Sequence, residues 1–287
     1  DLSAAGFRVY LVEESGSIGG GMARLDKTFP TGDCATCIIS PKLVECMRDH
    51  NVEIYTLADV SSIEGEAGNF KVTVNQRPRG VIADRCTGCG DCAEACDAEV
   101  SDPLNFSMGK KKGAHLPFEM AFPARFVLSP QIIGTDDAQK CKEACQYGAI
   151  DLEMEAKSMA LQVGAIVWAT GWEPYDATKI ENLGFGQYDN IVTNMMLERM
   201  ASPNGPSDGK IFRPSDGKGP ESVAFVQCAG SRDENHLPYC SYICCMASLK
   251  HATYIREQYP DTKVYIFYID IRSPGDRYEK FYNKIKE

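Results

Sequence analysis

The sequence predicts an α/β protein in which a nucleotide-binding type of domain is interrupted by a cysteine-rich insertion and followed by the start of a second, similar domain. Residues 8–14 form a short apolar segment that ends in acid and is followed by a run of glycines, a pattern typical of such domains. Residues 81–150 hold six of the thirteen cysteines and have no long periodic segment. Residues 222–269 then show a second strand–helix–strand pattern.

Composition limits the classes of protein to be considered. Of 287 residues, 44% are hydrophobic and 24% are charged, which is ordinary for a globular protein. No run approaches 18 apolar residues, so no transmembrane helix is predicted. The net charge of −10 argues against a nucleic-acid-binding protein. The odd, clustered cysteines and the lack of a signal peptide predict a cytoplasmic protein whose cysteines bind metal or do redox chemistry.

The first domain is expected to begin inside its first β–α–β unit. Residues 1–7 resemble the end of a helix, and residues 8–14 the strand that follows it, while the preceding strand and its GxGxxG loop are absent. We therefore expect the natural chain to start earlier. Glu13, at the end of the strand, is the candidate carboxylate for a ribose hydroxyl.

A glycine-rich segment follows, with glycines at 16, 19, 20 and 21. Glycines permit close approach of the backbone to a ligand, and the alternative is a flexible loop. Ser40 and Pro41 predict the start of a helix that runs to Met47.

Strands are predicted over residues 52–56 and 70–76, and a buried strand over residues 165–169. This last strand ends in Thr170 and Gly171, an ending that recurs beside the dinucleotide in flavoproteins with two dinucleotide-binding domains.

The second domain is expected after a linker rich in Pro, Gly, Ser and Asp over residues 201–220. Residues 222–227 and 263–269 are predicted strands, and residues 241–259 a helix between them. The turn after the first of these strands has no GxGxxG, which argues against a normal nicotinamide site. Only one further helix-like segment follows, so truncation is expected at this end too.

The strongest motif is CxxCxxCxxxC, formed by Cys86, Cys89, Cys92 and Cys96. Three thiolates on one tight loop suit three irons of a 4Fe–4S cluster, and glycines let backbone amides turn toward the cluster sulfurs. The alternative is structural zinc, which usually takes two separated pairs of ligands.

A second cluster motif is incomplete. Only its tail, Cys141 and Cys145, is present, and the preceding positions at that spacing are Thr135 and Ala138. In two-cluster ferredoxins the fourth cysteine of each motif ligates the other cluster. We therefore predict one cluster on Cys86, Cys89, Cys92 and Cys145. Cys96 and Cys141 are left for a second cluster that is absent or incomplete.

A further constellation combines the CxxC of Cys34 and Cys37 with Cys240, Cys244 and Cys245, and Cys228 lies just upstream of the latter group. Three interpretations remain open. The two half-sites could meet and hold another cluster, the CxxC could be a redox dithiol, or the cysteines could be buried structural thiols.

Several motifs together resemble the A subunit of heterodisulfide reductase, and they cover nearly the whole chain. They are residues 28–37, 41–45, 86–96, 213–217, 227–234, 238–241, 244–246 and 267–272.

The resemblance implies an FAD domain of thioredoxin-reductase type, in two parts at residues 1–78 and 153–205. A ferredoxin-like domain is inserted at residues 79–152, and a truncated second Rossmann-like domain starts at residue 206 and runs to 287.

It further implies an electron-transferring subunit whose flavin splits electron pairs between two paths. The expected partners are proteins like the B and C subunits of the same enzyme and a ferredoxin or a hydrogenase-type donor, in a hetero-oligomer.

In this interpretation Glu13 holds the FAD ribose, Gly19, Gly20 and Gly21 lie near the phosphates or ring, and Thr170 and Gly171 border the cofactor. No residue is assigned covalent chemistry. The alternatives are a pyridine-nucleotide-dependent flavin oxidoreductase, a ferredoxin-like electron relay without flavin, and a zinc-stabilised scaffold.

Overall fold

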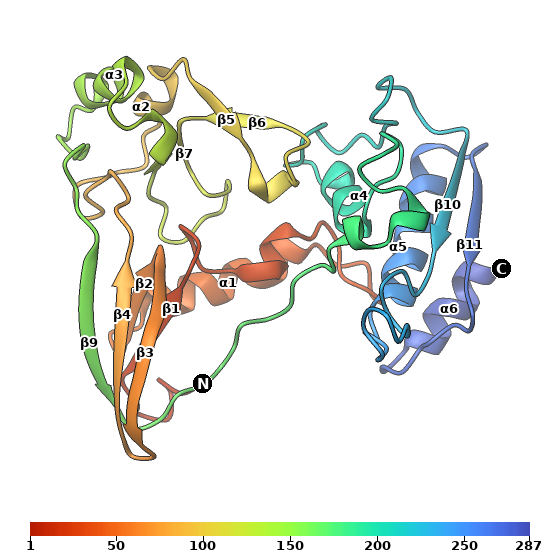
Figure 1. Ribbon diagram of the computed structural model, residues 1–287, viewed down its shortest axis with the longest axis horizontal. Coiled ribbons are helices and arrows are strands. Elements are labelled where there is room, and N and C mark those ends of the chain that lie inside the picture. The colour runs from red at the N-terminus through yellow and green to blue at the C-terminus, as the bar shows by residue number, and fades with distance from the viewer. The chain divides into compact units, whose positions relative to one another are not determined.

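The computed structural model describes residues 1–287, which divide into two compact units (Figure 1). Unit 1 comprises Asp1–Ala23 and Ile38–Gly171, and unit 2 comprises Arg24–Cys37 and Trp172–Glu287. The fold is mixed α/β, with several small sheets instead of one large sheet. None of its helices is long and apolar enough to cross a membrane.

A parallel strand pair opens the chain. β1 (Val9–Glu13) pairs with β2 (Val52–Thr56), and α1 (Ala35–Arg48) lies between them in sequence. Both predicted strands are confirmed. Parallel strands require a crossover connection, which a helix commonly supplies.

The predicted start of α1 was wrong. The helix begins at Ala35, five residues before Ser40, and contains Pro41 in its interior. Its first turn is capped by sulfur, because the amide of Cys37 donates to Sγ of Cys34 at 3.2 Å. Pro41 cannot donate a backbone hydrogen bond, but the helix continues through it. A cap formed by cysteine is not among the usual N-terminal signals, so the sequence pattern pointed to the wrong residue.

An antiparallel sheet of three strands follows in unit 1. Its order is β3 (Ala58–Glu66), β4 (Asn69–Gln76) and β9 (Lys157–Val163). The prediction for residues 70–76 is confirmed within β4. Its inner residues Val72 and Val74 are buried with Ala58.

The strand predicted over residues 165–169 is absent. β9 ends at Val163, and the next residues are extended without a pairing partner. Val167 and Trp168 are 68% and 67% exposed. A run of apolar residues becomes a strand only where a neighbour completes its backbone hydrogen bonds, and no neighbour does so here.

The cysteine-rich insertion lies between β4 and β9 and leaves the sheet at one end (Figure 1). Backbone pairing between Val81 and Ile150 joins its entry to its exit. Its elements are α2 (Asp91–Glu94), β5 (Glu99–Ser101), β6 (Lys110–Lys112), β7 (Ala114–His115), β8 (Val127–Leu128) and α3 (Asp136–Ala144).

Unit 2 contains α4 (Asn194–Ala201) and a second parallel strand pair, β10 (Ser222–Val226) with β11 (Lys263–Phe267). α5 (Cys244–Gln258) connects these strands, and α6 (Tyr278–Lys286) follows them. The predicted strand–helix–strand pattern is therefore confirmed.

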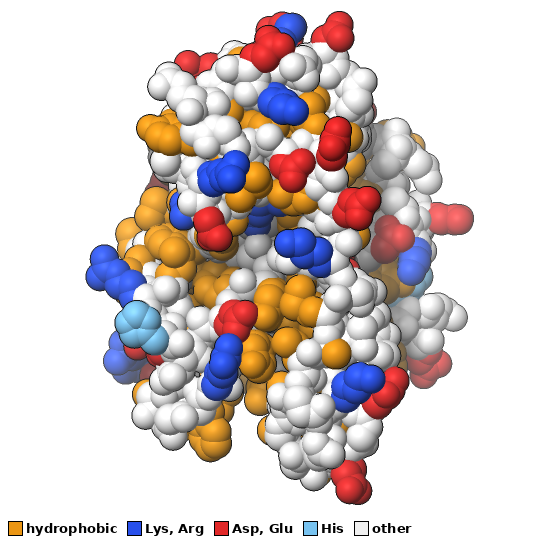
Figure 2. All heavy atoms as spheres, turned by 90° about the vertical axis from the view of Figure 1, so that its left-hand side faces the viewer, with side chains coloured by type: hydrophobic (Ala, Val, Ile, Leu, Met, Phe, Trp, Pro, Cys, Tyr) orange, Lys and Arg blue, Asp and Glu red, His pale blue; other side chains and the backbone are white.

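Short 3-10 turns complete the structure at η1 (Gly20–Arg24), η2 (Pro103–Asn105), η3 (Pro130–Ile132), η4 (Ala177–Lys179) and η5 (Glu181–Leu183). Figure 2 shows the face of unit 1 that lies on the left in Figure 1. Acidic and basic side chains are interspersed there among hydrophobic ones, and no continuous basic patch covers this face.

Candidate metal and cofactor sites

Four cysteines of the insertion line one small pocket. Cys86, Cys89 and Cys92 come from the loop before α2 and from α2 itself, and Cys145 comes from the end of α3. These are the four residues predicted to hold a single cluster. The insertion thus brings together a local motif and one cysteine that is distant in sequence.

Glycines shape the loop that carries the first three cysteines. Gly88 and Gly90 have φ values of 78° and 99°, a left-handed conformation that favours glycine. Gly90 is the residue before α2, so the turn into the helix depends on it. The loop leaves Cys89 exposed, whereas Cys92 is buried.

The electrostatics of this pocket disfavour free thiolates. Burial, together with the nearby sulfurs of Cys86, Cys89 and Cys145, raises the pKa of the Cys92 thiol to about 12. A bound cationic centre offsets that cost, because ligation deprotonates a cysteine. The crowded, partly buried set of four thiols therefore suits an iron–sulfur cluster.

No group of three or more His, Cys, Asp or Glu side chains converges so as to hold a single metal ion. Zinc requires its ligands to meet at one ion. In a 4Fe–4S cluster, each cysteine bonds a different iron, so the sulfurs are spread around a cube. Four cysteines that share a pocket without converging on a point fit the cluster better than zinc.

Cys96 and Cys141 have a different environment. Both are completely buried in the core of the insertion. The thiol of Cys141 donates to the backbone oxygen of Cys92 at 3.2 Å, and burial raises its pKa to about 12. Ala138, at the position where a second motif would need a ligand, is fully buried in the same core.

The nearest carboxylate is also occupied. Asp137 accepts hydrogen bonds from the backbone amides of Asp97 and Ala98 at 2.8 and 3.3 Å. It therefore stabilises the chain after Cys96, and no complete second set of ligands is formed here.

The residues expected to contact a flavin lie in unit 1. Glu13 ends β1, and its carboxylate accepts the amide of Ser15 at 2.8 Å. Gly19 and Gly20 have φ values of 131° and 53°, and Gly20 and Gly21 begin η1. No atom lies within 4 Å of a Cβ built on Gly20, so its backbone faces open space. A carboxylate at the end of a parallel strand and an open glycine turn fit the ribose side of a dinucleotide site.

Thr170 and Gly171 are exposed at the end of the unpaired segment after β9. Gly171 has a φ of 68°. Their predicted position beside a cofactor stays a prediction.

Arg79 is a residue that the sequence interpretation missed. It is buried, and burial lowers the pKa of its guanidinium to about 10. It donates to the backbone oxygen of Gly16 at 2.8 Å, to Oγ1 of Thr56 at 2.5 Å and to the backbone oxygen of Arg125 at 3.2 Å. This side chain joins the glycine-rich segment, β2 and the insertion. A lone arginine after a strand carries no sequence signal of this role.

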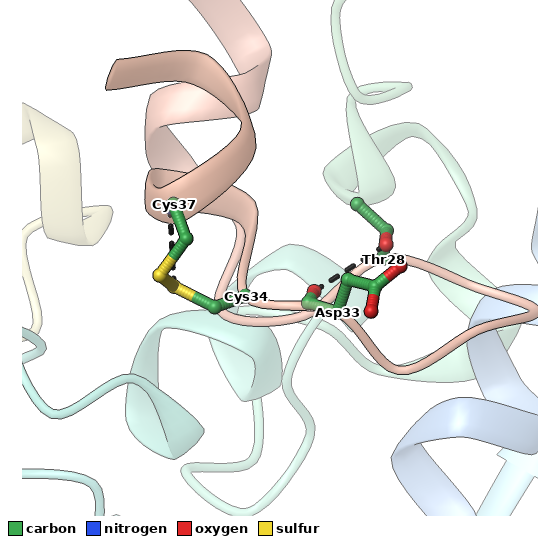
Figure 3. The surroundings of a disulfide bond; sticks show 4 residues. All are labelled: Thr28, Asp33, Cys34 and Cys37. Atoms are coloured by element: carbon green, nitrogen blue, oxygen red, sulfur yellow. Dashed lines mark hydrogen bonds between the residues drawn. A yellow bond between two sulfur atoms is a disulfide. The ribbon is translucent and has the colours of Figure 1, made fainter. Parts of the chain in front are cut away.

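In unit 2, Cys34 and Cys37 form a disulfide at the start of α1 (Figure 3). Both residues are exposed. Their sulfurs bond each other in this structure, so they ligate no metal until the disulfide is reduced.

The remaining cysteines of the constellation lie around the start of α5. The pKa of the Cys244 thiol is lowered because the thiol of Cys245 and the hydroxyl of Ser241, at 3.2 Å, donate to it. The hydrogen bond to Cys244 and burial raise the pKa of Cys245, and the nearby Cys228 adds to the rise. Cys240 accepts a backbone amide from two residues further along the chain at 3.4 Å. The structure thus adds Cys228 to this group, although it was not among the predicted site residues.

A buried polar network lies between α4 and α5. Glu198 accepts hydrogen bonds from Nζ of Lys250 at 2.8 Å and from Nε2 of His251 at 2.5 Å. Burial alone would raise the pKa of Glu198, but these two donors lower it to about 2. Nδ1 of His251 is buried without a partner. The three residues carry no motif, so no pattern in the sequence indicates the network.

The fold and these residues define an α/β protein with the cysteine pattern of an iron–sulfur protein. No protein-family model matches the chain.

Comparison with curated proteins identifies relatives along the whole chain. It is 44% identical over 100% of its length to the first of two numbered iron–sulfur A subunits of CoB–CoM heterodisulfide reductase from Methanopyrus kandleri. It is 45% identical over 100% of its length to the corresponding protein of Methanocaldococcus jannaschii. It is 40% identical, again over its whole length, to the A subunit of the ferredoxin/F420H2-dependent CoB–CoM heterodisulfide reductase of Methanosarcina acetivorans.

These matches confirm the resemblance to the A subunits of heterodisulfide reductase, a family of oxidoreductase subunits. The chain spans 44% of the length of the first two relatives and 36% of the third.

Proposed function

We propose that this chain is the part of an electron-transferring iron–sulfur flavoprotein subunit that brings a flavin and a 4Fe–4S cluster together. The observation that carries the proposal is the single pocket lined by Cys86, Cys89, Cys92 and Cys145. These residues would hold the cluster, which exchanges one electron at a time.

The flavin would be FAD, held by Glu13 at the ribose and by Gly19, Gly20 and Gly21 near the phosphates or ring. Thr170 and Gly171 would border it. A bound flavin supplies two-electron chemistry that a cluster cannot.

The chain's own contribution is rigid placement. Ile18 pairs with Phe122 of the insertion, and Arg79 joins the glycine-rich segment to the insertion. A cofactor on that segment would therefore be held at a constant distance from the cluster-bearing insertion.

The relatives' names suggest the reaction and the partners. They describe heterodisulfide reductase subunits, and some also name ferredoxin, F420H2, or H2 and formate. We propose that this chain works in such a cytoplasmic hetero-oligomer, with proteins like the B and C subunits and a ferredoxin or hydrogenase-type donor. Division of flavin electrons between two paths is part of the proposal.

The cysteines at the start of α5 are a second candidate site. Cys228, Cys244 and Cys245 lie close together, and Cys240 is near in sequence. They could ligate a further cluster without Cys34 and Cys37, which bond each other.

Iron and acid-labile sulfide should be measured on anaerobically purified chain, with EPR spectra after reduction by dithionite. About four irons per chain and one reduced-cluster signal support a single site, and about eight indicate a second. Stoichiometric zinc without iron contradicts the proposal.

The variant Cys89→Ser tests the assignment, because Cys89 is exposed and its substitution leaves the core intact. We expect loss of most of the iron at this site. Cys46→Ser is the matched control and should keep the wild-type iron content, since Cys46 belongs to no predicted site. Equal iron in all three proteins would contradict the assigned ligands.

A further inference from the structure

The exposed disulfide between Cys34 and Cys37 is distinct from the chain's other cysteines. The remaining eleven cysteines are free thiols. The disulfide closes a very short loop, so it restricts the unfolded chain little and contributes little stability in this way. Exposed disulfides are generally the labile or catalytic ones. Its position therefore points to chemistry instead of structural support.

The start of α1 favours a thiolate at Cys34. Cys34 directly precedes the helix, and the amide of Cys37 donates to its sulfur at 3.2 Å (Figure 3). This amide is one of the first-turn donors that have no partner within the helix. A helix N-terminus lowers the pKa of a cysteine placed there. After reduction, Cys34 would hold the negative charge and Cys37 would remain the protonated thiol.

Buried groups of α4 and α5 hold the segment that precedes the disulfide. The amide of Asp26 donates to Oε1 of Glu198 at 2.8 Å, and Nζ of Lys250 donates to the backbone oxygen of Lys27 at 2.5 Å. The amide of Lys27 also donates to the hydroxyl of Tyr254 at 3.2 Å. The segment is therefore fixed to the interior of unit 2.

The same segment pairs directly with the residues around Cys34. Lys27 and Cys34 form an antiparallel bridge, and the amide of Ala35 donates to the oxygen of Asp26 at 2.9 Å. Ala35, between the two cysteines, is fully buried. The two sulfurs are thus presented at the surface on a fixed base, as an exchange site requires.

We infer that Cys34 and Cys37 form a thiol–disulfide exchange site that reduces an organic disulfide. The Cys34 thiolate attacks one sulfur of the substrate, whose S–S bond breaks while a mixed disulfide forms. The second substrate sulfur leaves and takes a proton. The Cys37 thiol then loses its proton and attacks Sγ of Cys34, which re-forms the protein disulfide and releases the first substrate sulfur as a thiol.

Two electrons pass in this cycle from the protein dithiol to the substrate disulfide. A dithiol reductant restores the pair by the reverse exchange and becomes a disulfide itself. Neither the cluster nor the flavin takes part, so the inference is independent of the function proposed above.

Tryptic peptides allow the pair to be followed alone. Cleavage after Lys27 and Lys42 releases residues 28–42, which contain Cys34 and Cys37 and no other cysteine. Residues 43–48 contain only Cys46, on the same helix, and serve as an internal control. The whole chain is equilibrated anaerobically with mixtures of reduced and oxidised dithiothreitol, quenched with acid, alkylated and analysed by mass spectrometry.

We expect peptide 28–42 to change reversibly from disulfide to doubly alkylated dithiol within the series, while Cys46 stays alkylated throughout. A pair that remains fully reduced, or fully oxidised, across the series would overturn the inference. This measurement uses the wild-type chain, so it does not depend on the folding of any variant.

Two variants test the roles of the sulfurs with hydroxyethyl disulfide as a small substrate and insulin as a protein substrate. Reduced Cys37→Ser should accumulate a mixed disulfide on Cys34, at least tenfold faster than Cys46 reacts. In Cys34→Ser, modification of Cys37 should be at least tenfold slower. The substrate that reacts faster identifies whether the source is small or macromolecular. Reaction of Cys34 at the rate of Cys46, or loss of iron from Cys34→Ser, would overturn the inference.

Discussion

The buried pair of Lys250 and Glu198 should dominate the stability of unit 2. Their side chains are 5% and 1% exposed, and the ammonium nitrogen lies 2.8 Å from the carboxylate. The substitution Lys250→Met removes the positive charge and leaves the Glu198 carboxylate buried. Removing one partner of a buried ion pair typically costs about 3–5 kcal/mol. At about 1.4 kcal/mol per tenfold, the open state of this region becomes roughly 100- to 4,000-fold more populated.

Hydrogen exchange measured by mass spectrometry reports this opening segment by segment. Protection of the amides of α5 should fall by that factor, and residues 24–37 should lose protection with them, because Lys250 also donates to the oxygen of Lys27. The matched control is Lys42→Met. Lys42 pairs with Glu45 at 3.2 Å, but the side chains are 75% and 69% exposed, and such pairs contribute about 0–1 kcal/mol.

The double variant with Glu198→Gln separates the ion pair from packing. If the lone buried carboxylate causes the loss, removing its charge should recover part of the protection, so the two losses should not add. Loss of protection in α5 smaller than tenfold in Lys250→Met, or equal to that in Lys42→Met, would refute the reasoning.

Two further predictions concern the insertion. Gly80→Ala should lower its stability by about 1–3 kcal/mol in thermal denaturation, because φ is 68° and a Cβ would lie 2.9 Å from Leu128; Gly148→Ala, with φ of 56° and no atom within 4 Å, should lose less, and equal losses would exclude the clash. Burial lowers the pKa of His115 to about 4, below its ordinary value of 6.5, so the stability this neutral imidazole contributes is complete above pH 6.5 and is lost as the pH falls toward 4. The melting temperature should therefore fall over that range more steeply than in His115→Gln, and parallel curves would contradict the assignment.

Local patterns were sufficient for elements whose partners are also nearby or periodic. The strands β1, β2, β4, β10 and β11 were predicted because alternation and apolar runs mark them directly. The failures depended on distant partners. β3 is polar and exposed along most of its length, and it forms a strand because β4 pairs with it. Residues 165–169 have the composition of a strand but lack a neighbour.

The cluster pocket was predictable because its spacing is a property of the sequence. Three ligands lie on one loop, and the fourth follows from how paired cluster motifs share cysteines. The buried network of Glu198, Lys250 and His251 was not predictable, because α4 and α5 meet only in the folded chain. Nor does spacing reveal whether a cysteine is exposed, which decides its chemistry.

The cysteines of this chain show how position determines the role of one residue type. Four line a pocket where burial and mutual repulsion make free thiolates costly, so a cationic cluster is the favourable occupant. Cys96 and Cys141 share the spacing of cluster ligands, but they pack among apolar residues with no third or fourth ligand, and they act as core thiols. Cys34 has an amide donor and open solvent, which stabilise its thiolate without any metal. Because the surroundings of the thiolate differ in each case, iron content should report the first group, and reversible alkylation should report the pair at the start of α1.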